Sequence, residues 1–213
     1  MKLPVENIAA IVLAGGKSLR MGQDKRFLEI GGKPLIERVF EVLAPIFSEV
    51  LIVAAQPDPR LDGFGYPVVT DLRPGYATAG GLYTGLKTTR RRSVFAVACD
   101  MPCLDPGTIK KMLADEEETD IVIPCLVGTG LQPMHAIYGK ACLPYLEQMM
   151  DSGDLKLQHL LQAPLLRIRR IEEAALCSID PYLKSFLNVN TPADLEMARK
   201  LLSSRAHGNA PVN

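Results

Sequence analysis

The sequence lacks the features of a metal-thiolate, disulfide-bonded or strongly charged protein. Its 213 residues include three histidines and five cysteines, and no two cysteines form a C-x-x-C pair. We therefore expect neither a zinc site nor a disulfide framework, and we interpret the cysteines as buried thiols. Lys plus Arg and Asp plus Glu both number 24, so the net charge is zero. This balance argues against a nucleic-acid partner that is held by bulk charge.

The sequence also has no apolar run long enough to cross a bilayer. The first such run, Ile8–Leu13, follows a segment that is interrupted by charge and by proline. The run is shorter than the apolar part of a signal peptide with its cleavage site, and much shorter than the roughly 20 residues of a membrane helix. We therefore expect no membrane partner and a cytoplasmic location.

Short apolar runs alternate with helix-like patterns along the chain. A continuous apolar run that ends in glycine or in a carboxylate is typical of a parallel strand buried on both faces. The alternation predicts an α/β fold, in which a three-layer, doubly wound, mostly parallel sheet carries helices on both faces. The expected strands are residues 8–13, 51–55, 67–71, 94–98 and 121–124, and the expected helices begin near Pro34, Gly81, Asp105, Cys142 and Thr191.

Residues 132–138 break this alternation after a turn at residues 128–130. We expect them to form a small antiparallel addition at the edge of the sheet. Hydrophobic residues make up 47% of the chain, which is enough for one sizeable core. Residues 1–203 are therefore expected to form a single domain, and residues 204–213, which are mostly small or polar, a flexible tail.

The segment after the first predicted strand combines glycines with positive charge. Between Leu13 and Lys25 it holds three glycines and three cations, including Lys17 and Arg20. Backbone N–H groups can turn toward an anion where no Cβ intervenes, and Lys and Arg neutralise phosphates. The segment is predicted to bind a polyphosphate; the alternative is an ordinary glycine-rich turn with solvated charges. It is not a P-loop, because Ile11 stands where that motif requires its first glycine.

Two aspartates follow predicted strands, at the edge where such sheets bind ligands. Asp71 comes directly after one strand, and Asp100 follows the apolar run 94–99. Mg²⁺ prefers oxygen ligands, commonly one or two carboxylates together with phosphate oxygens and water. We expect Asp100 to be the metal ligand. The alternatives are a helix cap for Asp100 and a turn residue for Asp71.

Residues 13–25 read Leu-Ala-Gly-Gly-Lys-Ser-Leu-Arg-Met-Gly-Gln-Asp-Lys. This stretch resembles the signature of the molybdenum cofactor guanylyltransferases, which are nucleotidyltransferases with a glycosyltransferase-A-like fold. Gly15 stands where the sister enzymes that use cytosine usually have alanine, and this favours guanine. The resemblance spans nearly the whole chain, since it continues through residues 28–35, 71–75, 99–102, 131–133 and 186–192.

The resemblance implies an activity and a set of ligands. The expected enzyme uses Mg²⁺ to transfer GMP from GTP to the terminal phosphate of molybdopterin or Mo-molybdopterin. It would release pyrophosphate and form the molybdopterin guanine dinucleotide cofactor, with other molybdenum cofactor proteins as partners. The expected catalytic residues are Arg20, Lys25 and Asp100, of which Asp100 also binds the metal. The expected nucleotide-binding residues are Leu13, Ala14, Gly15, Gly16, Lys25, Gln56, Asp71, Gly80, Gly81 and Asp100.

Two departures from the family pattern fall within this set. Gln56 stands where the family commonly has asparagine after the second strand. The stretch Tyr76–Leu82 keeps two glycines but lacks the proline that often precedes this helix. The contact of Gln56 with the base and the shape of the later loop are therefore left open.

Binding of the acceptor is expected in the second half of the chain. For His135 the alternative is a structural role, and for Asn188 and Asn190 the alternative is that they hold the last helix in place. The residues expected to bind the acceptor are Gln132, His135, Asn188 and Asn190. Two other functions also stay open: a cytidylyl or sugar-phosphate nucleotidyltransferase, and a non-catalytic GTP-binding adaptor for cofactor delivery.

Overall fold

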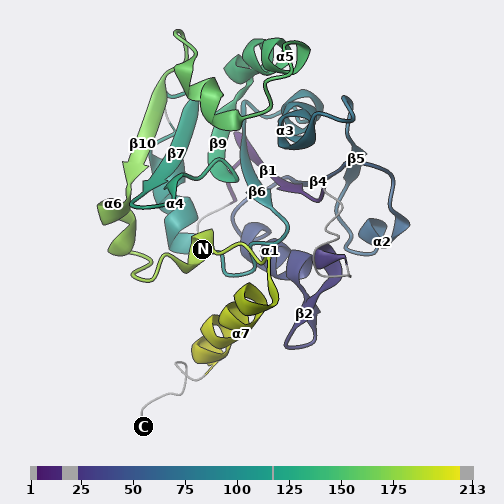
Figure 1. The fold of residues 1–213 in the computed structure, drawn as a ribbon, viewed down its shortest axis with the longest axis vertical. Coiled ribbons are helices and arrows are strands. Elements are labelled where there is room, and N and C mark those ends of the chain that lie inside the picture. The colour runs from purple at the N-terminus through teal and green to yellow at the C-terminus, as the bar shows by residue number, and fades with distance from the viewer. Residues whose placement is uncertain (1–3, 16–23, 117, 207–213) are drawn as a thin grey trace.

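The computed structural model describes residues 4–15, 24–116 and 118–206 of the chain. One large sheet forms its centre, with the strand order β10-β7-β9-β6-β1-β4-β5, and a short strand β8 pairs with β7 (Figure 1). All five strands expected from the sequence are present, within two residues of their predicted bounds. The strands of this sheet are β1 (Ile8–Leu13), β4 (Val50–Ala54), β5 (Val68–Thr70), β6 (Ser93–Ala98), β7 (Ile121–Leu126), β8 (Gly130–Leu131), β9 (His135–Gly139) and β10 (Ile168–Glu172).

Most neighbouring strands of the sheet run parallel, as predicted. The pairs β1–β4, β1–β6, β4–β5 and β7–β10 are all parallel. Strand β9 is the exception, because it pairs antiparallel with both β6 and β7. The edge position predicted for residues 132–138 is therefore wrong. All five residues of β9 are buried, so this strand gains more from a central position, where both its faces and both its edges are covered.

Helices cover both faces of the sheet, as the α/β pattern predicts. Alternate residues of β1 enter two separate cores. Ala10 and Val12 pack with α1 and α4, whereas Ile11 and Leu13 pack with α3 and α5. In Figure 1, α3 and α5 lie on the opposite side of the sheet from α1 and α4. The helices are α1 (Leu35–Leu43), α2 (Pro59–Asp62), α3 (Ala77–Thr88), α4 (Pro106–Ala114), α5 (Leu143–Asp151), α6 (Glu173–Cys177) and α7 (Pro192–Ala206).

Helix α3 lies unusually close to β1 because glycines face the strand. A Cβ at Gly85 would stand 2.6 Å from Cδ1 of Ile11, and one at Gly81 would stand 3.2 Å from Cδ2 of Leu13. Only glycine permits this approach without displacing the strand's side chains. The contact brings the N-terminal turn of α3 to the carboxyl end of β1.

Hydrogen bonds fix the starts of the two helices that were expected to begin near Asp105 and Thr191. The Asp105 side chain accepts from the backbone N–H groups of the first turn of α4, at 2.8 and 3.2 Å. At the start of α7, the Asp194 N–H donates to Thr191 Oγ1 at 3.2 Å, and the Thr191 N–H donates to Asp194 Oδ2 at 2.7 Å. Such a reciprocal pair satisfies two donors that a helix start otherwise leaves free.

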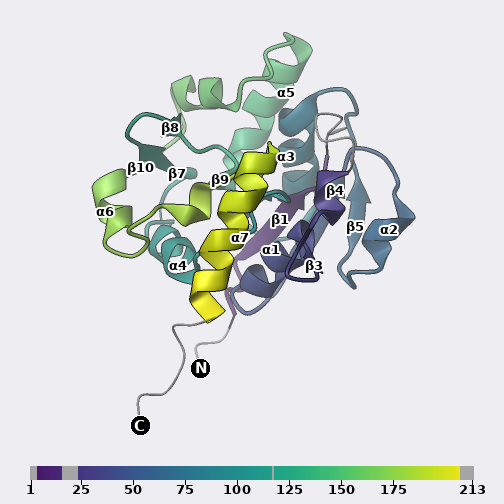
Figure 2. The ribbon, with the colours of Figure 1, turned by 60° about the horizontal axis from the view of Figure 1, so that its bottom comes forward.

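Helix α7 packs against a small hairpin rather than against the main sheet. The hairpin strands β2 (Glu29–Ile30) and β3 (Lys33–Pro34) pair antiparallel. A third core joins the two elements through Ile30 and Ala198, and Figure 2 shows α7 crossing this side of the molecule. The helix continues to Ala206, past the predicted domain boundary at residue 203. Residues 207–213 lie outside the described part of the chain.

No helix among the described residues is long and apolar enough to cross a membrane.

Candidate functional site

A cleft of about 970 Å³ lies at the carboxyl ends of β1, β4 and β5. Its volume is at the upper end of the range of small-molecule sites, about 300–1,000 Å³. This is the edge at which open α/β sheets bind their ligands. Six of the predicted nucleotide-binding residues line it, namely Leu13, Ala14, Gly15, Gln56, Asp71 and Gly81.

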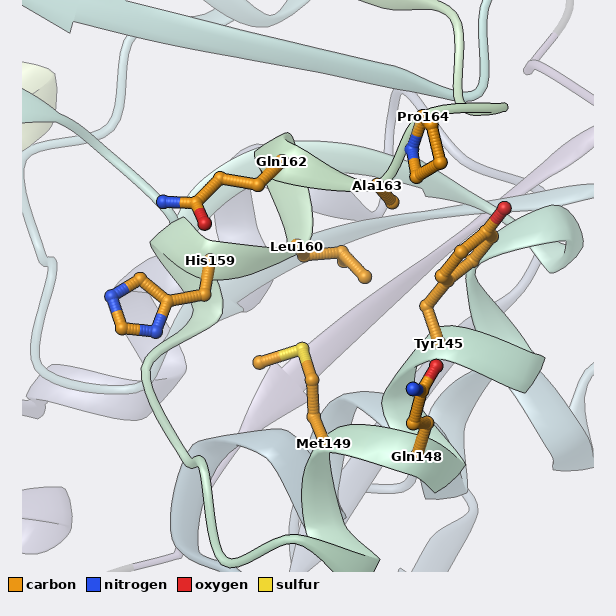
Figure 3. A pocket seen from close by; sticks show the side chains of 8 residues that line it. All are labelled: Tyr145, Gln148, Met149, His159, Leu160, Gln162, Ala163 and Pro164. Carbon is orange, nitrogen blue, oxygen red and sulfur yellow. The ribbon is translucent and has the colours of Figure 1, made fainter.

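A second, smaller cavity lies on the outer layer of the molecule. It measures about 210 Å³ and is formed by α5 and the 3₁₀ helix η4 (Leu157–Gln162). In Figure 3, Tyr145 and Met149 of α5 and Leu160 of η4 border it. None of the predicted site residues lines this cavity, and its volume is below the typical range of ligand pockets. The cleft at the sheet edge is therefore the candidate site.

Three polar residues from distant parts of the sequence meet in a cluster close to the cleft. None of the three lines the cleft itself, but Lys25 follows the lining residue Asp24, and Asp100 stands two residues after the lining residue Ala98. The Lys25 ammonium donates to Asn190 Oδ1 at 2.7 Å and lies 3.4 Å from Asp100 Oδ2. The Lys25 and Asp100 side chains are 14% and 18% exposed, so solvent can still reach both. The structure thus joins two predicted catalytic residues with one residue that was expected to bind the acceptor.

Backbone structure fixes the members of this Lys25–Asp100–Asn190 cluster. Asp100 follows the end of β6, and its carbonyl accepts from the Val189 N–H at 2.9 Å. That bond ties the segment before α7 to the end of β6. Lys25 begins the 3₁₀ turn η2 (Lys25–Phe27), which is capped by the side chain of Asp24.

Burial raises the pKa of the Asp100 carboxyl, and the nearby Lys25 ammonium opposes this rise. A charged carboxylate that is partly removed from water gains most from a cation close to its oxygens. A further cation bound beside Asp100 would therefore stabilise its ionised form.

The residues present fit a divalent cation that is held jointly with a ligand. The described residues contain no group of three or more His, Cys, Asp or Glu side chains placed to hold a metal by themselves. Mg²⁺ commonly takes only one or two carboxylates and completes its shell with phosphate oxygens and water. Asp100 supplies one carboxylate of this kind.

Asp71 is placed by contacts with α3. Its Oδ1 accepts from the Thr84 hydroxyl at 2.8 Å and from the Arg73 N–H at 3.1 Å. Gly80 lies beneath the carboxylate, since a Cβ there would stand 2.9 Å from Asp71 Oδ2 and 2.8 Å from the Arg73 carbonyl. Gly80 is buried and does not line the cleft, whereas Gly81 does. Asp71 thus makes the turn contacts that were its alternative role and also faces the cleft.

A network of four charged residues, whose pairing the sequence did not predict, forms part of the cleft wall. Arg26 bonds to Asp24 at 2.6 and 2.9 Å and to Asp58 at 2.6 Å. Arg60 contacts the same two carboxylates, at 2.9 Å from Asp24 and 2.8 and 2.9 Å from Asp58. All four residues line the cleft. We call Asp24, Arg26, Asp58 and Arg60 the charge network.

The pairing within the charge network keeps both of its carboxylates ionised. The hydrogen bond from Arg60 lowers the pKa of Asp58 to about 2, and the hydrogen bond from Arg26 lowers the pKa of Asp24. The guanidinium of Arg60 also lies 4.3 Å from the centre of the Phe27 ring. The network is electrically neutral in sum, so it adds rigidity to the cleft wall without adding net charge.

The remaining acceptor-binding expectations find no support in the structure. His135 is completely buried between the rings of Phe95 and Phe186, at centroid distances of 5.1 and 4.7 Å. It thus occupies the structural position that was its alternative. Gln132 donates to Thr129 and Gly130 of its own turn.

Asn188 donates only to the nearby Phe186 carbonyl, at 3.3 Å, among the described contacts. Two further predicted site residues, Gly16 and Arg20, lie outside the described residues, as does the cation Lys17.

Comparison with known proteins gives consistent matches. A family model, described as the MobA-like NTP transferase domain, matches residues 10–170. A protein of Natranaerobius thermophilus, named as a probable molybdenum cofactor guanylyltransferase, is 36% identical over 203 residues. This match covers 92% of the present chain and 97% of that protein.

Solved structures agree with this match. The crystal structure of molybdopterin-guanine dinucleotide biosynthesis protein A from Archaeoglobus fulgidus is 26% identical, with a TM-score of 0.79. It covers 92% of this chain and 99% of that one. A Mycobacterium tuberculosis protein in complex with manganese is 18% identical, with a TM-score of 0.66, and covers 93% of this chain and 99% of that one. The second likeness is one of fold alone.

Proposed function

The chain belongs to the family of MobA-like NTP transferases, and from this membership we propose that it is a molybdenum cofactor guanylyltransferase. It transfers GMP from GTP to the terminal phosphate of molybdopterin or Mo-molybdopterin. The products are pyrophosphate and the molybdopterin guanine dinucleotide cofactor. The relative of Natranaerobius thermophilus, which carries this activity in its name, matches almost the whole of both chains.

One observation carries the proposal: the Lys25–Asp100–Asn190 cluster forms next in the chain to Asp24 and near Ala98, two residues that line a cleft large enough for a nucleotide. Nucleotidyl transfer needs positioning and charge neutralisation, and it needs no covalent enzyme intermediate. A cation, a carboxylate and an amide at one point supply these functions.

The chemistry assigns a role to each residue of the cluster. An oxygen of the acceptor's terminal phosphate forms a bond to the α-phosphorus of GTP, and the bond from that phosphorus to the β-phosphate oxygen breaks. Lys25 stabilises the negative charge that grows on the phosphates during this step. Asn190 holds the Lys25 ammonium at 2.7 Å. Because a phosphate nucleophile is already ionised at neutral pH, no general base is required.

We assign the base end of the nucleotide to the opposite part of the cleft. Leu13, Ala14 and Gly15 supply a wall that a planar base can approach, since Gly15 has no side chain. Gln56 offers both a donor and an acceptor, and Asp71 offers an acceptor. Both residues line the cleft.

The cofactor proposed is Mg²⁺, held by Asp100 together with phosphate oxygens. When bound, it would neutralise part of the triphosphate charge. The proposed substrates are GTP and molybdopterin, and other molybdenum cofactor proteins are proposed partners for delivery and receipt. The cytoplasmic location expected from the sequence stays a prediction.

The test is pyrophosphate release with a panel of nucleotides. We expect release only when GTP, Mg²⁺ and molybdopterin are all present, and not when ATP or CTP replaces GTP. A preference for CTP would show a cytidylyltransferase instead. Binding of GTP without any release in the presence of acceptor would show a non-catalytic adaptor.

A further inference from the structure

Arg26 follows Lys25 in the chain, but the two side chains reach opposite sides of the site. Lys25 extends to Asp100 and Asn190. Arg26 extends to Asp58, in the loop after β4, at 2.6 Å. Both residues belong to the single 3₁₀ turn η2, so whatever holds one side chain also fixes the backbone that carries the other.

The guanidinium of Arg26 connects three separate segments. It makes two bonds to Asp24 in its own turn, one bond to Asp58, and one to the carbonyl of Ala14 at 3.3 Å. Ala14 follows the end of β1 and lines the cleft. A planar guanidinium suits this task because its donors have a fixed geometry, which an ammonium lacks.

Arg60 does not duplicate this connection. It shares the carboxylates of Asp24 and Asp58 with Arg26, but it makes no bond to Ala14 among the described contacts. Its side chain is 57% exposed, whereas that of Arg26 is 15% exposed. Arg26 is therefore the member of the charge network that holds η2 against the first strand.

We propose that Arg26 is a positioning residue for Lys25: through Ala14 and Asp58 it fixes η2, and thereby the place of the Lys25 ammonium at the phosphates. This inference rests on the proposed function. From the η2 backbone the Lys25 ammonium reaches Asn190 at 2.7 Å and Asp100 at 3.4 Å, so a shift of that backbone would move the ammonium away from both partners. The position of its backbone therefore decides where its charge lies.

The turn should stay folded when Arg26 is replaced, because a second anchor remains. The Phe27 ring stacks on Phe64 at 6.2 Å. The expected result of Arg26→Ala is therefore a displaced Lys25 in a folded protein. We expect kcat to fall by about 10–100-fold, since a misplacement of about 1 Å costs on this order.

The decisive measurement is a double-mutant cycle on kcat between Arg26→Ala and Lys25→Ala. If Arg26 acts through Lys25, its replacement should change kcat by less than about twofold once Lys25 is already alanine. The conservative variant Arg26→Lys should show the same coupling with a smaller loss, because it keeps the charge but not the fork of donors. Arg26→Lys also serves if Arg26→Ala does not fold.

The matched control is Arg91→Ala. Arg91 is likewise a half-buried arginine in an ion pair, at 2.9 Å from Glu49, but it does not line the cleft. We expect it to leave kcat unchanged.

The inference would be overturned if Arg26→Ala lowered kcat by the same factor in the wild type and in Lys25→Ala. It would also be overturned if Arg26→Ala left kcat unchanged. Failure of the proposed function has a separate signature, namely a wild-type protein that releases no pyrophosphate from GTP and molybdopterin.

Discussion

Acidification should destabilise this protein through His135, by an amount that follows from its burial. The side chain is fully buried, and neither ring nitrogen has a hydrogen-bond partner among the described residues. Burial lowers the pKa of His135 to about 3, although the nearby backbone of Ser185 and the carboxylate of Asp180 oppose this shift. In the unfolded chain the same group has a pKa of about 6.5.

The sign and size of the effect follow from linkage. Between these two pKa values the unfolded chain binds a proton that the folded protein does not, so stability falls as the pH is lowered. Each pH unit is worth about 1.4 kcal/mol. A decrease in pH from about 7.5 to about 5 ends about 1.5 units below the pKa of the unfolded chain. It should therefore lower the free energy of unfolding by about 2 kcal/mol. This loss is a large share of a typical folding free energy of about 5–15 kcal/mol.

Urea unfolding of the wild type and of His135→Leu at both pH values provides the assay. Leucine has a similar volume and does not titrate, so the variant should lose about 2 kcal/mol less than the wild type on acidification. Equal losses in the two proteins would refute this interpretation of the His135 environment. The comparison cancels the other titrating groups, which both proteins share.

The remaining predictions concern the cleft and its supports. Lys25→Ala should lower kcat by about 10²-fold or more, the scale for losing one electrostatic stabiliser, with little change in melting temperature; normal turnover would remove Lys25 from the mechanism. Asp100→Asn should abolish activity at neutral pH, because the variant lacks the proposed metal ligand. Burial raises the pKa of Asp100, so the ionised carboxylate lowers the stability of the folded protein above that pKa. The variant should therefore keep or raise the melting temperature. The wild-type kcat/KM should fall on acidification at a higher pH than an ordinary aspartate would allow, and a profile that stays flat down to pH 4 would contradict this. Gly80→Ala should cost about 1–3 kcal/mol and weaken GTP binding, because its Cβ would stand 2.8–2.9 Å from the Arg73 carbonyl and the Asp71 carboxylate. The control Gly63→Ala, whose Cβ would meet only one atom at 3.6 Å, should change stability by less than about 0.5 kcal/mol in urea unfolding.

Local patterns in the sequence predicted the elements well. The runs that form β1 and β6 are continuous and apolar because both faces of these central strands are buried. The caps at Asp105 and at Thr191 were predictable because a cap depends on residues only a few positions apart. Strand β10 was missed because its sequence, IRRIE, has three exposed charged residues that hide the strand pattern at the sheet edge.

Long-range arrangement was harder to predict. The position of β9 between β6 and β7 depends on pairing with strands earlier in the sequence, which no local pattern specifies. The charge network escaped for the same reason, because Arg26 and Asp58 are 32 positions apart. The one available sign was that Asp24 and Arg26 flank Lys25 with opposite charges. His135 is the reverse case: its residue type allowed a site or a structural role, and the fold places it in the core, which is the structural alternative.

The most direct test of GMP transfer at the Lys25–Asp100–Asn190 cluster is the fate of a labelled phosphate. Wild-type protein, Mg²⁺ and molybdopterin should be mixed with GTP that carries ³²P at either the α or the γ position. The α label should appear in the acceptor product and the γ label in pyrophosphate, and Lys25→Ala should produce both signals about 10²-fold more slowly or not at all. Appearance of the γ label in the acceptor, or full transfer by Lys25→Ala, would contradict the proposed chemistry.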